Sequence, residues 1–137
     1  MTKPQLQETN PTLSDPASVH RALADRFNAH DLEGLLALYD AEATLVPTPG
    51  AVVAGHAALR EALAGFLALR PRETFVDTLS VHVVGDLALT RSRWGLVGTN
   101  PANGDTIQLE HRGVEMMRRR ADGSWRFLVD DPFGADS

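Results

Sequence analysis

The chain has 137 residues, 43% of them hydrophobic and 23% charged, with a formal net charge of −5 and no cysteine. That length fits one domain with its own core, and the lack of cysteine excludes disulfides, thiolate metal sites and a cysteine nucleophile. The acidic balance disfavours nucleic acid as a partner, because the densest basic run, Arg118–Arg120, is typical of a solvated strand end.

The first residues differ in character from the rest of the chain. Residues 1–14 are polar and offer little to bury, so we expect a flexible N-terminal tail followed by a single domain over residues 15–137. The tail lacks the apolar centre of a signal peptide, and no later run approaches the ~20 apolar residues of a membrane span. These features favour a cytoplasmic protein without a membrane partner.

Three helices are predicted in the first half of the domain. Pro16 suits the first position of a helix whose apolar residues recur at four-residue spacing. A short second helix over residues 32–39 places Tyr39 on its apolar stripe, and a third over residues 56–70 is ended by Pro71. The helices need a sheet to cover their apolar stripes.

Strands fill the rest of the domain. Alternation over residues 43–47 and a brief apolar segment after the turn at Pro49 predict a small hairpin. Beyond Glu73, β-branched residues and period-two patterns predict four strands joined by hairpin-type turns, over residues 73–84, 87–98, 106–120 and 124–130. Helices followed by a strand meander indicate an α+β domain rather than an alternating parallel one.

Strand register decides which side chains share a face. If Asn103 and Gly104 form the tip of a hairpin, Trp94 pairs with His111 and Thr90 pairs with Glu115. That face then carries an aromatic wall, an imidazole, a carboxylate and two hydroxyls, from Thr90, Ser92, Trp94, His111 and Glu115. A one-residue slip would put Arg93 there in place of Trp94.

Several short stretches resemble the nuclear-transport-factor-2-like superfamily and its SnoaL-like and ketosteroid-isomerase-like members. They are the phrase over residues 28–35, the pair 38–39, residues 43–45, Gly55 with residues 58–60, and the closing stretch 122–127. The resemblance implies a cone-shaped, curved antiparallel sheet that encloses a pocket together with three N-terminal helices. It also implies a second subunit on the convex face, and therefore a homodimer.

The resemblance does not carry over the isomerase's catalytic residues intact. The position that matches its general base is Pro47, which cannot transfer a proton. The position of its oxyanion-hole tyrosine falls near Leu23, which cannot donate a hydrogen bond. The second oxyanion-hole acid falls near Glu115, and a pocket tyrosine falls at Tyr39. Two of the four matched positions, Tyr39 and Glu115, therefore keep a polar side chain.

We accordingly predict a small-molecule-binding protein that needs no cofactor and holds no metal. His111 and Glu115 are the candidate acid/base pair, with a surface salt bridge as the alternative. The candidate ligand-binding residues are Tyr39, Trp94, Thr90 and Asp131, although Tyr39 and Trp94 also suit the core and Asp131 also suits a turn cap. The implied chemistry is isomerisation, cyclisation or hydration of a small hydrophobic or polyketide-like substrate, and the alternative is a non-catalytic ligand-binding or dimeric association domain.

Overall fold

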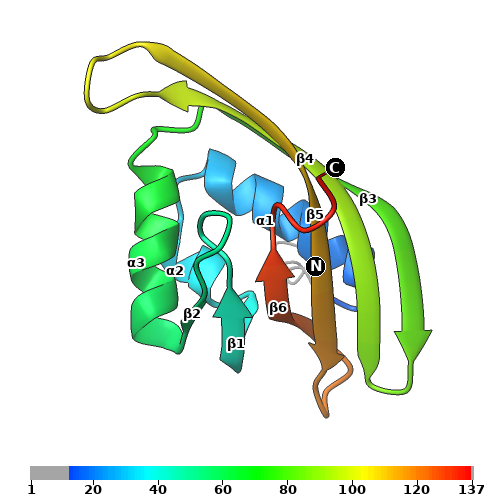
Figure 1. Ribbon diagram of the computed structural model, residues 1–137. Helices are drawn as coiled ribbons and strands as arrows, with labels where there is room; N and C mark the ends of the chain where they lie inside the picture. The colour runs from blue at the N-terminus through cyan, green and yellow to red at the C-terminus, as the bar shows by residue number, and fades with distance from the viewer. Residues whose placement is uncertain (1–12, 137) are drawn as a thin grey trace, which may run out of the picture.

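The computed structural model describes residues 13–136 and contains three helices and six strands (Figure 1). In chain order they are α1 (Pro16–Asn28), α2 (Leu32–Leu36), β1 (Tyr39–Leu45), β2 (Val53–Ala54), α3 (His56–Leu67), β3 (Glu73–Val84), β4 (Leu87–Thr99), β5 (Thr106–Arg119) and β6 (Trp125–Asp131). The predicted α+β class is confirmed. Most of the expected tail lies in residues 1–12, outside the described residues, whereas Leu13 is buried and its carbonyl accepts the Trp125 N–H at 2.9 Å.

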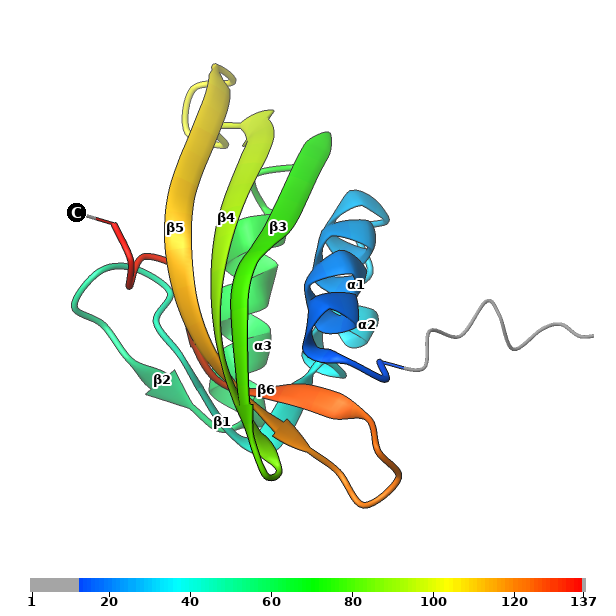
Figure 2. The same cartoon turned by 90° about the vertical axis from the view of Figure 1, so that its right-hand side faces the viewer.

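All six strands belong to one curved, unclosed sheet with the order β2-β1-β6-β5-β4-β3. The long strands β3, β4 and β5 bend together, as Figure 2 shows from the side. Four of the five strand pairings are antiparallel, but β1 and β6 run parallel. The sheet is therefore mixed at this point, where a wholly antiparallel sheet was expected.

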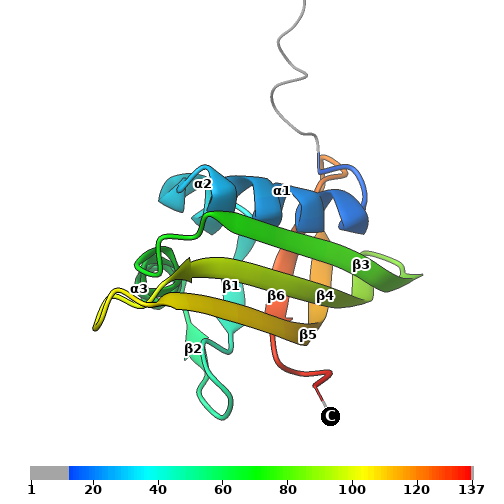
Figure 3. The ribbon, with the colours of Figure 1, turned by 90° about the horizontal axis from the view of Figure 1, so that it is seen from above.

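Local sequence explains the ends of the first helix. Asp15 accepts the Ser18 N–H at 2.8 Å while the Ser18 side chain approaches the Asp15 backbone, which is a capping box, and Pro16 is the first helical residue. The helix runs along β3, at the edge of the sheet (Figure 3). It thereby covers one side of the concave face.

The second helix is shorter than predicted. It ends at Leu36, and Tyr39 is the first residue of β1 rather than part of the helix. The Phe127 N–H of β6 donates to the Leu38 carbonyl at 2.8 Å, and Tyr39 pairs with Phe127. Pairing with a distant strand therefore overrides the helical spacing of the apolar residues.

The predicted register of the long hairpin is confirmed. Trp94 pairs with His111 and Thr90 pairs with Glu115, and β4 and β5 stay in register from one end to the other. Gly104 lies in the connecting loop with φ 78°, a left-handed backbone conformation that suits glycine. The loop chemistry thus sets which side chains face the helices.

The core lies between the helices and the concave face of the sheet. Val19, Leu35, Leu59 and Phe127 are completely buried there, and Trp125 is a core residue as well. Within residues 13–136, no helix has both the length and the apolar character needed to cross a membrane.

Candidate functional site

A cavity opens on the concave face between α1, α3 and the strands. It contains about 550 Å³ of empty space, counting the part that is open to solvent. Its walls are mainly apolar, with Phe27 from α1, Phe66 from α3 and Trp94 from β4 as the large aromatic groups. Its polar lining residues are Tyr39, Thr74, Ser92, Glu115 and Asp130. An apolar cavity with a few converging polar groups is typical of a small-molecule site.

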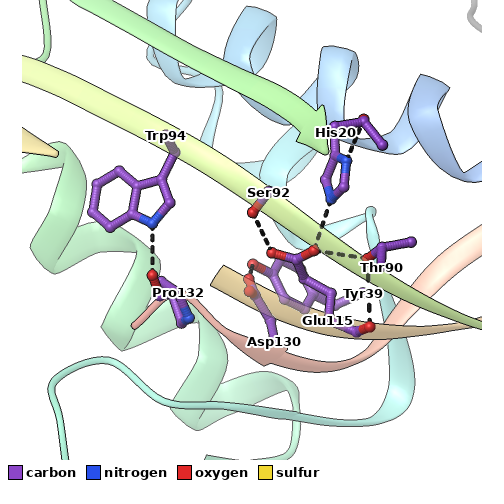
Figure 4. Close-up of polar contacts among 9 residues, drawn as sticks. His20, Tyr39, Thr90, Ser92, Trp94, Glu115, Asp130 and Pro132 are labelled. Carbon is purple, nitrogen blue, oxygen red and sulfur yellow. Dashed lines mark hydrogen bonds and ion pairs between the residues drawn. The ribbon is translucent and has the colours of Figure 1, made fainter. Parts of the chain in front are cut away.

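Glu115 stands at the centre of a buried hydrogen-bond network (Figure 4). Its Oε1 accepts the Thr90 hydroxyl at 2.7 Å and lies 2.9 Å from His20 Nε2, while its Oε2 accepts the Ser92 hydroxyl at 2.6 Å. His20 is completely buried, and its Nδ1 lies 2.6 Å from the Thr78 hydroxyl. An ionised carboxylate only accepts hydrogen bonds, so this set of donors fits a charged, immobile Glu115.

Asp130 is the second buried carboxyl group at this end of the cavity. Its Oδ2 accepts the Tyr39 hydroxyl at 2.5 Å, and its Oδ1 has no hydrogen-bond partner among the described residues. Burial, together with the nearby charge of Glu115, raises the pKa of Asp130 to about 7. Burial and the Asp130 charge also raise the pKa of Tyr39 well above its usual value, so Tyr39 stays a hydroxyl donor.

A β-bulge turns Asp130, and not Asp131, into the cavity. Met117 pairs with Phe127 but the preceding residue, Met116, pairs with Val129, so β6 contains one extra residue. If side chains alternated strictly between the two faces of the sheet after Phe127, Asp131 would point into the cavity. The extra residue reverses this alternation, so Asp130 points into the cavity instead. The Asp131 carboxylate instead accepts the Phe133 N–H at 3.1 Å, in the turn after β6.

His111 shares a sheet face with Glu115 but the two side chains have different partners. Its Nδ1 lies 2.7 Å from Asp136, whose carboxylate also accepts the Arg112 N–H at 2.8 Å. Its ring packs against Trp94 and Phe133, with ring centres 5.3 and 4.9 Å away. The C-terminal segment thus covers His111 at the outer end of the face, while Glu115 lies at the inner end with His20.

The three remaining predicted residues, Trp94, Tyr39 and Thr90, differ in their place relative to the cavity. Trp94 lines the cavity and donates from its indole N–H to the Pro132 carbonyl at 2.7 Å. Tyr39 lines the cavity and is held by Asp130. Thr90 lies behind the lining and holds Glu115 in place.

Two residues of the site were not among the predicted ones, His20 and Asp130. His20 precedes Leu23 by three residues and Phe27 by seven, so it lies on the apolar stripe of α1, and a histidine in such a stripe is a signal for a buried polar partner. Asp130 could not be separated from Asp131 by sequence, because the bulge that decides between them leaves no pattern of its own. Among residues 13–136, no group of three or more His, Asp or Glu side chains is placed to hold a metal ion.

Solved structures with this fold come from several bacteria. One is a ketosteroid isomerase-like protein from Erwinia carotovora atroseptica, with 22% identity, TM-score 0.73 and coverage of 89% of this chain and 95% of that one. A candidate dehydratase of the NTF2-like family from Streptomyces avermitilis has 19% identity, TM-score 0.65 and coverage of 82% and 88%. A candidate calcium/calmodulin-dependent protein kinase type II association domain from Thiobacillus denitrificans has 18% identity, TM-score 0.68 and coverage of 86% and 94%.

At these identities the likeness to the solved structures establishes the fold alone. No curated protein matches the sequence. The family model of the SnoaL-like domain, however, matches residues 19–127, which include most of α1, all of α2 and α3, and the strands β1 to β5. The chain therefore belongs to the SnoaL-like domain family, within the nuclear-transport-factor-2-like fold.

Proposed function

We propose that the cavity binds a small, mainly apolar molecule with a carbonyl or hydroxyl group, and that Asp130 exchanges a proton with it. The reaction class is cofactor-independent proton transfer, as in isomerisation, cyclisation, or the addition or removal of water. The proposal rests on one observation: a buried carboxyl group lines the cavity with one oxygen held by Tyr39 and the other without a partner in residues 13–136.

The two carboxyl groups suit different roles. Glu115 has three donors and is held as a fixed negative charge. Asp130 has a pKa of about 7, mainly because of burial, so it changes protonation near neutral pH. A buried carboxyl group whose pKa lies near neutral is suited to acid/base work. Asp130 is therefore the better candidate than the His111–Glu115 pair expected from sequence.

The proposed step is a proton transfer. The Asp130 carboxylate removes a proton from a carbon next to the ligand's carbonyl group, and the C–H electron pair forms an enolate. If the ligand has a β,γ double bond, Asp130 returns the proton to the γ-carbon and the ligand is isomerised. If it has a β-hydroxyl group, the enolate expels hydroxide, which takes the proton from Asp130 and leaves as water. Neither requires an electron acceptor, and the apolar walls exclude water from the enolate.

A hydrogen-exchange assay tests the proposal directly. 2-Tetralone, a flat apolar ketone with acidic protons next to its carbonyl, is incubated with the protein in D₂O and followed by ¹H NMR. We expect the protein to accelerate exchange, with a rate that rises with pH through a midpoint near 7 because the carboxylate is the base. Asp130→Asn is expected to remove the acceleration.

Asp131→Asn provides a matched control, because it makes the same chemical change one residue away in the turn. It is expected to keep the acceleration, with a midpoint only slightly below that of the wild type, because the charge of Asp131 makes a small contribution to the raised pKa of Asp130. Equal rates for wild type and Asp130→Asn would contradict a catalytic Asp130. Binding of the ketone without any exchange would favour the non-catalytic ligand-binding function instead.

A second proposal concerns association into a homodimer. Leu89, Met116 and Val129 form a cross-strand row next to Thr90, Glu115 and Asp130, so they point to the opposite, outer face of the sheet. Leu89 and Val129 are exposed, at 45% and 39%.

Exposed apolar side chains in a row across strands favour a protein interface. Sedimentation should therefore give twice the chain mass for the wild type. Leu89→Glu should give the single-chain mass, and a monomeric wild type would contradict the proposal.

A further inference from the structure

Two arginine side chains of the β5–β6 hairpin have no carboxylate partner. In the basic run at the end of β5, Arg118 and Arg119 each form ion pairs with carboxylates of the chain. Arg120, the third residue of the run, forms no ion pair within residues 13–136, and neither does Arg126 on β6. The hairpin of this acidic chain, whose net charge is −5, therefore leaves two basic groups without a counter-charge.

The two unpaired arginines lie on one face of the hairpin. Arg126 is the cross-strand partner of Arg118, so both side chains point to the outer face of the sheet. Arg120 follows Arg118 by two residues, and its backbone N–H donates to the Ser124 carbonyl at 2.7 Å, so alternation places its side chain on that face too. Burial lowers the pKa of Arg126, and the positive charges of Arg120 and Arg26 lower it as well. The guanidinium groups of Arg120 and Arg126 are therefore close enough to repel each other.

The Arg126 side chain is held in place but its donors are not all satisfied. Its Nη1 donates to the Trp125 carbonyl at 2.9 Å, and its Nε is buried without a partner in the described part of the chain. Its Nη2 has no partner there either but, unlike Nε, it is not buried, so a ligand can reach it. The nearby Asp122 is engaged by the turn, since its Oδ1 accepts the N–H and the hydroxyl of Ser124 at 2.9 and 2.6 Å. An accessible charged donor that the protein leaves unsatisfied suits an anion.

We propose that Arg120 and Arg126 bind a phosphate group between them, at the turn end of the hairpin and apart from the cavity, whose wall includes neither residue. The two side chains offer two planar forks of N–H donors and two positive charges. A carboxylate fills one such fork, whereas a phosphate group has at least three free oxygens and a charge of about −1.5 to −2 near neutral pH, so it matches both. The inference is independent of the proposed function, because it concerns a different face of the molecule.

An NMR titration of the ¹⁵N-labelled wild type with inorganic phosphate tests the site. The ionic strength is held constant by replacing chloride with phosphate. The Arg126 Nε–H resonance should shift and saturate as phosphate is added, and it should stay in place when chloride alone is varied. Phenyl phosphate separates the two sources of the group: tighter binding than inorganic phosphate identifies an organic phosphate as the ligand, and equal binding identifies the free ion.

Two neighbouring substitutions make the test specific. Arg120→Gln removes one of the two forks and should weaken phosphate binding roughly ten- to hundred-fold, which is the usual effect of losing a hydrogen bond to a charged group. Arg119→Gln removes the same charge one residue away, where the side chain pairs with Asp86, and should keep the wild-type affinity within about two-fold. No shift of the Arg126 resonance with phosphate, an equal shift with chloride, or equal phosphate affinity in wild type and Arg120→Gln would overturn the site.

Discussion

The unusual protonation of Asp130 predicts a stability that falls as pH rises. The pKa of its carboxyl group is raised from 3.8 to about 7 in the folded protein, chiefly by burial. Between these pH values the folded chain holds a proton that the unfolded chain has released, so the free energy of unfolding falls by about 1.4 kcal/mol per pH unit. The stabilisation is complete below pH 4 and is lost as pH rises through 7. Over the whole window the loss is about 4 kcal/mol.

Urea denaturation of wild type and Asp130→Asn at several pH values between 4 and 8 measures this loss. Taking the difference between the two proteins cancels the other titrating groups, since asparagine is neutral throughout and its Oδ1 can still accept the Tyr39 hydroxyl. The wild type should lose stability relative to the variant as pH rises. A difference that stays constant across this range would refute a buried, protonated Asp130. Asp131→Asn should lose stability with rising pH as the wild type does, with a midpoint only slightly lower.

Four other substitutions give distinct outcomes. Tyr39→Phe removes the hydrogen bond that stabilises the Asp130 carboxylate, so the pH midpoint of 2-tetralone exchange should rise by about one unit. Glu115→Gln removes the charge that raises the pKa of Asp130, so that midpoint should fall, and urea denaturation should show a loss of about 1–3 kcal/mol from the broken network. Gly98→Ala would place a Cβ 2.3 Å from a backbone carbonyl oxygen and should cost about 1–3 kcal/mol, whereas Gly65→Ala, in open space on α3, should raise the melting temperature.

The sequence was sufficient for the register of β4 and β5. Alternating side chains are a local feature, and a one-residue slip would have moved Trp94 to the outer face. The connection itself is a loop over residues 100–105 that contains Asn103 and Gly104, since Thr99 pairs with Thr106. The same reasoning therefore placed Thr90 beside Glu115 correctly. Local patterns also gave the start of α1, where Pro16 follows its capping residue.

The positions that the sequence did not reveal depend on contacts between distant segments. Tyr39 leaves the helical pattern because β1 pairs in parallel with β6, some 90 residues later in the chain. Asp130 faces the cavity only because of the bulge after Phe127. His20 reaches Glu115 from another element. Each of these is a tertiary effect, and only His20, on the apolar stripe of α1, has a local signal.

The arrangement of the two carboxyl groups supports the proposed proton transfer. Glu115 and Asp130 are cross-strand partners on one face, so each raises the cost of charging the other. The donors are divided unequally: Glu115 has His20, Thr90 and Ser92, whereas Asp130 has only Tyr39.

Burial and the nearby charge of Glu115 therefore leave Asp130 with a proton that it can release near neutral pH. A ligand that brings a hydrogen-bond donor to the free oxygen of Asp130 would favour the charged form, and the base would then be activated by the binding of its own substrate.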